Sequence, residues 1–239
     1  MDAFTVKEQP HYLELSFHIP STANAFSLSA AQELGRIQSQ YLEWKKAVVV
    51  RSGHARMFCS GGNLSDYQRL ESKPEGLKIN EEIESILNQF GAWPVIKLAF
   101  INGDVLGGGM EWLARFDYRW STATAAFAFW QRRIGLSTGW GGGRAWARRI
   151  GEGKQRQLLL EGRLLGAQEA RATGLIDRVL SEWSVERELL LWGESLSVDP
   201  DVTSQLSAWS TKSERDSFHK LWMATSHRAA LKRWTKKPT

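Results

Sequence analysis

The amino-acid sequence predicts an α/β fold built around a mainly parallel sheet. Short runs rich in β-branched and apolar residues alternate with longer segments whose apolar residues recur at helical spacing, and this alternation is typical of α/β proteins. Glycine-rich turns follow two of the predicted strands, at Phe58–Leu64 and Gly103–Trp112. Ligands of parallel sheets bind beyond the carboxyl ends of the strands, so both turns are candidate binding elements.

The first part of the chain predicts a strand, a helix and a second strand. Apolar and polar residues alternate over Tyr12–Ile19, which is typical of a strand with one buried face. After a polar turn at Ser21–Asn24, apolar residues at helical spacing predict a helix over Leu28–Trp44. The β-branched run Ala47–Arg51 is typical of a strand buried on both faces, and the first glycine-rich turn follows it.

The middle of the chain continues the alternation. A turn is expected at Lys73–Gly76, followed by an amphipathic helix over Leu77–Phe90 and a buried strand over Pro94–Ile101. The second glycine-rich turn comes next and opens directly into a helix. Tyr118–Ser121 is a further short strand candidate.

The last part of the chain is mostly helical. Short helices are expected at Arg144–Ile150, Lys154–Leu160 and Ala167–Thr173, followed by a strand over Leu175–Leu180. We therefore divide the chain into a core over residues 1–184 and a C-terminal helical region over residues 185–239, with a break at Asp199–Pro200. The C-terminal helices are too small to stand alone, so we expect them to pack on the core or on a neighbouring subunit.

Composition limits the class of protein. The chain has 239 residues, 42% apolar and 24% charged, which suffices for one large domain. It has no apolar run of about 18 residues and no basic segment followed by an apolar one at the N-terminus, so neither a membrane span nor a secretory signal is expected. The single cysteine, Cys59, fits a reducing cytoplasm. We expect Cys59 to be a half-buried packing residue rather than a nucleophile.

The charge of the chain permits an anionic partner without identifying one. The net charge is +5, but acidic residues are interspersed with the basic ones and no nucleic-acid-binding motif is present, so we expect no nucleic-acid partner. A phosphate-bearing small molecule would use the same electrostatics. The five histidines show no spacing typical of metal ligands, so no metal is expected.

The two glycine-rich turns together predict a site for a developing negative charge. Without a Cβ, the amides of Gly62 and Gly108 are open to a ligand oxygen. The Gly108 amide also lies at the start of a helix, where it has no intrahelical acceptor and favours an anion. Two such donors on a thioester carbonyl would stabilise its enolate. Each turn alone is more typical of a tight strand–helix connection, and it is their combination that predicts the paired site.

Glu111 is the candidate acid or base. It falls in the first turn of the helix that begins at the second glycine-rich turn. A glutamate at that position also stabilises a helix electrostatically, which is the structural alternative. Beside two oxyanion donors, however, a carboxylate could transfer a proton.

Four segments, in order, resemble the crotonase (enoyl-CoA hydratase/isomerase) superfamily: FCSGGNL, INGDVLGGGMEWLARFDYR, IGLSTGWGGGRAWARRIG and LLGAQEARATGLIDRVL. The resemblance implies a ββα superhelix with a C-terminal helical trimerisation region, and a homotrimer or a dimer of trimers. It implies an acyl-CoA substrate, with coenzyme A as part of the substrate and no separate cofactor. It places the oxyanion donors at Gly62 and Gly108 and the first catalytic glutamate at Glu111. It also implies coenzyme A contacts at Ser60, Gly61, Asn63 and Leu64.

One position departs from the hydratases of this superfamily. They have a second glutamate where this chain has Gln131, and an amide cannot abstract a proton. A single carboxylate is similar to the branch of ethylmalonyl-CoA and methylmalonyl-CoA decarboxylases, which the string GLSTGWGG around Trp140 also resembles. So does ERDSFHKLW at Glu214–Trp222. Decarboxylation needs no base for cleavage of the carbon–carbon bond. Trp130 and Trp140 either form a dry wall of the pocket or pack the core.

The sequence therefore predicts a decarboxylase-like lyase that acts on an acyl-CoA through a stabilised enolate. An enoyl-CoA hydratase or isomerase is the alternative within the same superfamily. A protein that binds acyl-CoA without turning it over is the alternative of another class.

Overall fold

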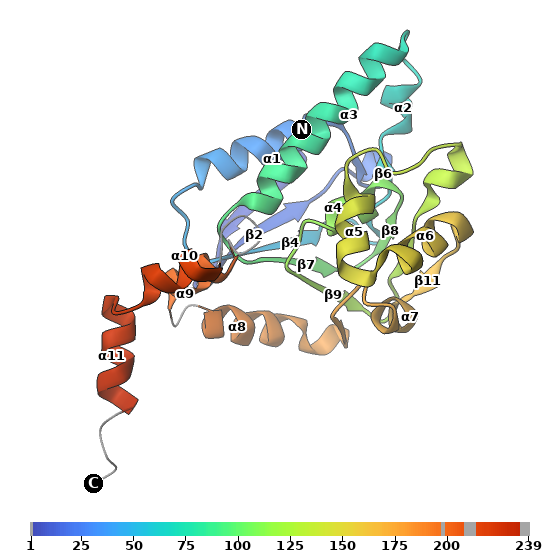
Figure 1. The fold of residues 1–239 in the computed structure, drawn as a ribbon. Helices are drawn as coiled ribbons and strands as arrows, with labels where there is room; N and C mark the ends of the chain where they lie inside the picture. The colour runs from blue at the N-terminus through green and yellow to red at the C-terminus, as the bar shows by residue number, and fades with distance from the viewer. Residues whose placement is uncertain (1, 197–198, 208–213, 235–239) are drawn as a thin grey trace.

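The computed structural model describes residues 2–196, 199–207 and 214–234 of the chain. Its main sheet has six strands in the order β1-β2-β4-β7-β9-β12 (Figure 1). All neighbouring pairs are parallel except β1 and β2. The strands are β1 (Phe4–Glu8), β2 (Tyr12–Phe17), β4 (Ala47–Ser52), β7 (Lys97–Ile101), β9 (Tyr118–Thr122) and β12 (Arg178–Leu180). The predicted mainly parallel sheet is confirmed.

The sequence reasoning missed strand β1. It pairs antiparallel with β2, with Phe4 opposite Phe17. Three of its five residues are exposed, so it lacks the buried apolar run by which the central strands were found. Its start is held by Glu33, whose carboxylate accepts hydrogen bonds from the amides of Ala3 at 2.7 Å and Phe4 at 3.0 Å.

The two faces of the main sheet are covered by different helices. Helices α1 (Leu28–Gln40) and α3 (Lys73–Ala92) lie side by side on one face, and α8 (Val185–Leu196) lies on the other (Figure 1). Alternation along β2 explains both contacts, because Leu13, Leu15 and Phe17 belong to the larger core cluster under α1 and α3. Tyr12 packs on the opposite side, in the cluster that contains Val185 and Leu189 of α8.

Several boundaries differ from the prediction, two of them at helices. Helix α1 ends at Gln40 rather than at Trp44. The turn predicted at Lys73–Gly76 is wrong, because these residues form the first turn of α3. The Ser72 hydroxyl accepts a hydrogen bond from the Glu75 amide, and proline follows at the start of the helix. A serine N-cap and a proline in the first turn both favour the start of a helix, and they outweigh the preference of Gly76 for a turn.

Two small sheets lie beyond the main sheet. One has the order β11-β10-β8-β5 and the other pairs β3 with β6. Their strands are β3 (Ala25–Phe26), β5 (Met57–Cys59), β6 (Gly61–Gly62), β8 (Asp104–Leu106), β10 (Ala126–Ala128) and β11 (Leu165–Gly166). Both glycine-rich turns belong to these small sheets, so they lie further from the ends of the main strands than the sequence suggested.

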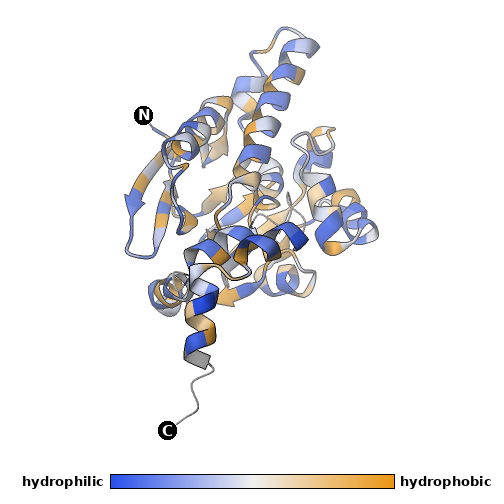
Figure 2. Cartoon of the chain, turned by 60° about the vertical axis from the view of Figure 1, so that its left-hand side comes forward, coloured by the Kyte–Doolittle hydropathy of each residue, from blue (hydrophilic) through white to orange (hydrophobic). Residues whose placement is uncertain are grey.

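The remaining elements are short helices. They are η1 (Pro20–Thr22), α2 (Leu64–Tyr67), α4 (Gly108–Leu113), η2 (Trp130–Ile134), α5 (Gly142–Ile150), α6 (Glu152–Glu161), α7 (Ala167–Ala172), η3 (Glu182–Ser184), α9 (Pro200–Ser207), α10 (Glu214–Leu221) and α11 (Thr225–Trp234). The helices predicted around residues 144–173 are confirmed. The strand predicted over Leu175–Leu180 is shorter, as β12. Helix α11 points away from the rest of the molecule in both views (Figures 1 and 2).

Within residues 2–196, 199–207 and 214–234, no helix is both long enough and apolar enough to cross a membrane.

Candidate active site

The strands that lead into the two glycine-rich turns are paired. β5 runs parallel to β8, with Met57 opposite Asp104. Gly61 and Gly62 follow β5, and Gly108 follows β8. Parallel strands end at the same edge, so the two turns emerge together. A Cβ added to Gly61 would lie 3.3 Å from the Gly108 nitrogen, which confirms that the turns touch.

A cavity of about 520 Å³ opens where the two turns meet. Its walls come from η1 and β3, from the first glycine-rich turn, from the second, and from η2. The lining residues are Ser21, Thr22, Ala23, Ala25, Ser60, Gly61, Gly62, Asn63, Leu64, Ser65, Leu106, Gly107, Gly108, Trp130, Gln131 and Ile134. None of these side chains is ionisable in the ordinary pH range. The cavity is therefore uncharged, and most of its surface is apolar.

All but two of the site residues predicted from the sequence line this cavity. Those that do are Ser60, Gly61, Gly62, Asn63, Leu64, Gly108, Trp130 and Gln131. Glu111 and Trp140 do not line it, and both lie behind its wall. The structure thus brings the predicted residues to one place and removes the predicted carboxylate from the surface of the cavity.

Trp140 forms the layer directly behind the two glycines. A Cβ on Gly108 would lie 2.6 Å from Cη2 of the Trp140 ring, and a Cβ on Gly62 would lie 3.4 Å from its Cζ2. The ring therefore excludes any side chain larger than hydrogen at position 108. At position 62 the tighter neighbour is Tyr67, whose Cε2 would lie 2.9 Å from a Cβ. Gly108 is the first residue of α4, so its amide has no acceptor within the helix.

Glu111 is almost completely buried and its carboxylate is fully engaged. Oε2 accepts hydrogen bonds from the amides of Trp140 at 2.8 Å and Gly142 at 3.1 Å. Oε1 accepts from the Gly139 amide at 3.0 Å and from Nε2 of Gln131 at 3.2 Å. Burial raises the pKa of Glu111, and these donors oppose that shift without cancelling it. In this conformation the carboxylate holds the 139–142 loop in place.

Every polar atom of Trp140 has a partner, which fixes the ring. Its amide donates to Glu111, its carbonyl accepts from the Arg115 guanidinium at 2.7 Å, and Nε1 donates to the Asn80 side chain at 2.8 Å. The Tyr67 hydroxyl donates to the same Asn80 oxygen at 3.1 Å. Arg115, Asn80 and Tyr67 were missed by sequence reasoning. No sequence signal distinguishes them from ordinary polar residues of helices.

Gln131 connects Glu111 to the cavity. It is the second residue of η2, lines the cavity and is 6% exposed. Its Nε2 donates to Glu111, whereas its buried Oε1 has no hydrogen-bond partner within the described part of the chain. The neighbouring Trp130 also lines the cavity, and its buried indole Nε1 likewise lacks a partner there. One unpaired acceptor and one unpaired donor thus belong to adjacent residues of the cavity wall, and neither atom is itself exposed.

Asn24 fixes the part of the cavity wall that η1 and β3 form. It is fully buried, and its φ of 56° is in the left-handed region. Its Oδ1 accepts from the Ile19 amide at 2.7 Å, and its Nδ2 lies within hydrogen-bond distance of the Ser52 hydroxyl and of the carbonyls of Phe17, Met57 and Phe58. The Asn24 carbonyl accepts from the Ser60 amide at 3.3 Å. One side chain therefore connects the cavity-lining loop to the first glycine-rich turn.

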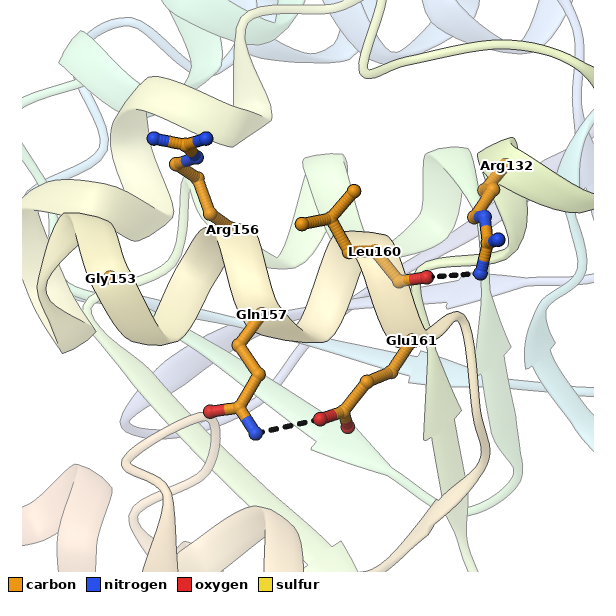
Figure 3. Close-up of a pocket in the computed structure, with 6 residues that line it drawn as sticks. All are labelled: Arg132, Gly153, Arg156, Gln157, Leu160 and Glu161. Atoms are coloured by element: carbon orange, nitrogen blue, oxygen red, sulfur yellow. Dashed lines mark hydrogen bonds between the residues drawn. The ribbon is translucent and has the colours of Figure 1, made fainter.

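A second hollow, of about 570 Å³, lies over α6 and contains none of the predicted site residues (Figure 3). Arg132 of η2 donates to the Leu160 carbonyl at its edge, and Arg133 donates to the Gly162 carbonyl at 3.1 Å. Cations favour the carboxyl ends of helices. These two contacts hold η2, and with it Trp130 and Gln131, against the end of α6.

Cys59 lies behind the cavity rather than in it. It is fully buried, not half-buried as expected, and burial raises the pKa of its thiol to about 12. A thiol with that pKa is not a nucleophile at neutral pH. Within the described residues, no group of three or more histidine, cysteine, aspartate or glutamate side chains could hold a metal ion.

Comparisons with known proteins agree on one family. A family model described as enoyl-CoA hydratase/isomerase matches residues 9–224. The chain is 32% identical over 177 residues to ethylmalonyl-CoA decarboxylase of Danio rerio, an alignment that covers 73% of this chain and 58% of that protein. It is 30% identical over 161 residues to mitochondrial methylglutaconyl-CoA hydratase of Mus musculus, covering 66% and 51%. The chain thus spans about half the length of these curated relatives.

Solved structures share the fold. The crystal structure of an enoyl-CoA hydratase from Bacillus anthracis superimposes with a TM-score of 0.91 at 22% identity, covering 100% of this chain and 98% of that one. An enoyl-CoA hydratase/carnithine racemase from Magnetospirillum magneticum superimposes with a TM-score of 0.89 at 20% identity, covering 100% and 95%. At these identities the similarity concerns the fold alone.

Proposed function

Because the chain belongs to the enoyl-CoA hydratase/isomerase (crotonase) family, we propose that it is an enzyme that decarboxylates an acyl-CoA through a thioester enolate. The family membership and the crotonase fold agree with the sequence analysis. The choice of decarboxylation over hydration or isomerisation is our proposal. It rests on one observation, which is that no ionisable side chain lines the cavity.

The two glycine amides are the proposed oxyanion donors. Gly62 and Gly108 both line the cavity, and both are partly exposed. Bound between them, the thioester oxygen would gain charge as the enolate forms, and preorganised donors stabilise that charge more than they stabilise the neutral carbonyl. Loss of one such donor costs about 3–4 kcal/mol of transition-state stabilisation.

Decarboxylation suits a cavity without a free acid or base. When the bond from the α-carbon to the carboxylate breaks, its electron pair moves toward the thioester carbonyl, and no proton has to be removed. Hydration, in contrast, requires a positioned base and a positioned acid. Gln131 can serve as neither, and Glu111 is turned away from the cavity and engaged with four N–H donors. This favours an orienting role for Glu111 over direct proton transfer.

The coenzyme A portion of the substrate is proposed to lie along the first glycine-rich turn. Ser60, Gly61, Asn63 and Leu64 line the cavity on that side and are the positions that the family resemblance implies. Coenzyme A would arrive as part of the substrate, and we propose no separate cofactor. The division into a core over residues 1–184 and a C-terminal helical region, and assembly into a trimer or a dimer of trimers, likewise stay proposals.

An acyl-CoA panel tests the function directly. The purified protein is incubated with malonyl-, methylmalonyl-, ethylmalonyl- and crotonyl-CoA, and the products are read by mass spectrometry. Loss of the mass of carbon dioxide supports the proposal. Gain of the mass of water on crotonyl-CoA would identify a hydratase instead, and saturable binding without any product would identify a non-catalytic acyl-CoA-binding protein.

A further inference from the structure

We propose that the outer face of α8 binds the α8 helix of a second copy of the chain, with the two helices antiparallel about a two-fold axis. The contact is made by four residues on the side of α8 that faces away from the main sheet. These residues, which we call the outer stripe, are Arg187, Leu190, Leu191 and Glu194. This contact is independent of the proposed catalytic function.

The spacing of the outer stripe places its members on one side of the helix. They occupy positions i, i+3, i+4 and i+7, which are neighbours on the surface of an α-helix. The two leucines are 47% and 50% exposed, and both charged residues are exposed as well. The other side of α8 packs on the main sheet through Val185 and Leu189, and α8 lies at the lower edge of the molecule in Figure 1. Apolar residues on two sides are typical of a helix that is covered on both.

The two charged residues of the outer stripe have no ion-pair partner within the described part of the chain. Glu186 and Glu188 of the same helix do, because they pair with arginines of the main sheet at 2.9 Å and 2.8 Å. Arg187 also lies near the N-terminal end of α8 and Glu194 near its C-terminal end. The helix dipole disfavours a cation at the first end and an anion at the second. In a single chain, both charges are therefore poorly placed.

An antiparallel copy of α8 supplies what both charges lack. Arg187 and Glu194 stand at equal distances from the midpoint between the two leucines. A two-fold axis through that midpoint brings each arginine opposite the glutamate of the other copy and brings the leucines of the two copies together. Each charge then also lies near the favourable end of the partner helix. A two-fold contact requires a surface that is complementary to itself, and the outer stripe meets this requirement. A parallel copy would oppose like charges.

Trp183 extends the apolar part of this surface. It belongs to η3, one turn before Arg187, and its side chain is 97% exposed. Covering an aromatic ring of this size removes a large apolar area from water, and tryptophan is among the residues that most often anchor interfaces. The contact then has leucines at its centre, an ion pair on each side and a tryptophan toward each end.

Exchange of the two charges tests the pairing. Arg187→Glu opposes glutamates across the axis and Glu194→Arg opposes arginines, so by light scattering each variant should have half the mass of the wild type. An equimolar mixture of the two variants should regain the wild-type mass, because each supplies the charge that the other lacks. The chain that carries both substitutions should regain it too. Both substitutions suit the helix dipole, so a lower mass does not reflect a weakened helix.

A matched control and a cross-link complete the test. Arg144→Glu changes an exposed arginine at the equivalent position of α5 and should leave the mass unchanged. In Arg187→Cys combined with Glu194→Cys, the two thiols of one chain lie about 10 Å apart along the helix, too far for a disulfide bond. The proposed contact places each beside the other position of the second copy, so oxidation should give a covalent dimer. The native Cys59 is fully buried and does not interfere.

Several results would overturn the contact. They are a wild type with the same mass as the single-charge variants, a mixture of these variants that stays at half the wild-type mass, and a double-cysteine chain that forms no covalent dimer. Arg187→Cys alone should not cross-link, because the two-fold axis keeps its two copies about 10 Å apart along the helices, and efficient cross-linking would also contradict the antiparallel register. None of these results bears on the acyl-CoA panel, which tests the catalytic function separately.

Discussion

Glu111 shows how one carboxylate is balanced between burial and hydrogen bonding. Burial disfavours its charge, and three backbone amides and one side-chain amide favour it. The balance still raises the pKa of Glu111 above its ordinary value. The folded protein therefore binds this proton more tightly than the unfolded chain does.

That difference has a defined sign in the pH dependence of stability. A carboxyl group whose pKa is raised in the folded state contributes stability that is fully present below its unfolded pKa of about 4.3. This contribution is lost as the pH rises through the folded-state pKa. We expect the free energy of unfolding of the wild type, relative to Glu111→Gln, to decrease as the pH rises above about 4. Urea denaturation of both proteins across this range measures it, and a difference that grows with pH would contradict the raised pKa.

Gly108 has no room for a larger residue. In Gly108→Ala the new methyl would lie 2.6 Å from Cη2 of the Trp140 ring. The backbone of Trp140 is held by Glu111 and Arg115, and turning the ring would break the bond from its Nε1 to Asn80. The backbone at position 108 should shift instead, which would move its amide out of hydrogen-bond distance of the thioester oxygen. We expect kcat for the best acyl-CoA to fall by about 10²–10³-fold.

A second glycine offers the control for this substitution. Gly153 lies in α6, and a Cβ there would meet nothing within 4 Å. Gly153→Ala should keep full activity and raise the free energy of unfolding by up to about 1 kcal/mol. Steady-state kinetics and denaturation of both variants test these expectations. Full activity in Gly108→Ala would show that the Gly108 amide is not an oxyanion donor.

Residue chemistry was predictable where a local pattern carried it. The glycines at 62 and 108 could be found because each lies in a glycine-rich turn that follows a predicted strand, and Gln131 because it stands at an aligned position. The engagement of Glu111 could not be predicted, since its partners at 139–142 come from a loop whose course depends on tertiary packing. Asn80 and Arg115 were missed for the same reason.

At the scale of elements, the loop around Asn24 shows how a buried polar residue positions a binding wall. Ala23 and Asn24 both have positive φ values, of 53° and 56°, and both lie at the cavity or beside it. Left-handed backbone is costly for residues with a Cβ, and asparagine tolerates it best after glycine. The hydrogen bonds of Asn24 to its own loop and to the first glycine-rich turn stabilise this conformation.

Asn24→Ala should therefore destabilise the protein. It leaves the Ile19 amide and several buried carbonyls without their partner, and we expect a loss of about 2–4 kcal/mol in the free energy of unfolding. Asn24→Gly loses the same hydrogen bonds but accepts the positive φ, so it should be less destabilised than the alanine variant by about 1 kcal/mol. Denaturation of the two variants measures this difference. Equal stability would show that the backbone conformation relaxes freely.

Elements were predictable in proportion to the length and regularity of their patterns. Helices α5 and α6 and strand β4 carry strong periodicity or a β-branched run and were found within a few residues. Strand β1 has a short, mostly exposed sequence. The small strands β3 and β6 have two residues each, and they exist only because tertiary contacts bring their backbones together.

At the scale of the whole molecule, the helices cover the two faces of the main sheet because side chains of the central strands point alternately to one face and the other. The sequence predicted a mainly parallel sheet, because βαβ order permits little else. It did not predict that α8 would cover the second face. That contact depends on Val185 and Leu189 meeting Trp120 and Leu180 across the sheet, and no local pattern encodes such a pairing.

Several large apolar side chains of the C-terminal helices are exposed and are not covered by the rest of the chain. Phe218 and Trp222 stack with ring centroids 5.4 Å apart, yet they are 56% and 57% exposed. Leu190, Leu191 and Leu206 are also exposed. On α11, which stands clear of the body, an apolar band lies between polar residues (Figure 2). Large exposed apolar patches mark interaction sites. We propose that neighbouring copies of the chain cover the exposed apolar side chains of the C-terminal helices.

Oligomeric state tests that proposal. Size-exclusion chromatography with light scattering should give the mass of a trimer or a dimer of trimers for the wild type. Phe218→Ser combined with Trp222→Ser removes the stacked pair and should shift the mass toward that of one chain, because aromatic anchors dominate interface energies. Lys220→Ser alters an exposed residue of the same helix and should leave the mass unchanged. A wild type that elutes as a monomer at all concentrations would rule out this assembly and leave the exposed aromatic pair to another partner.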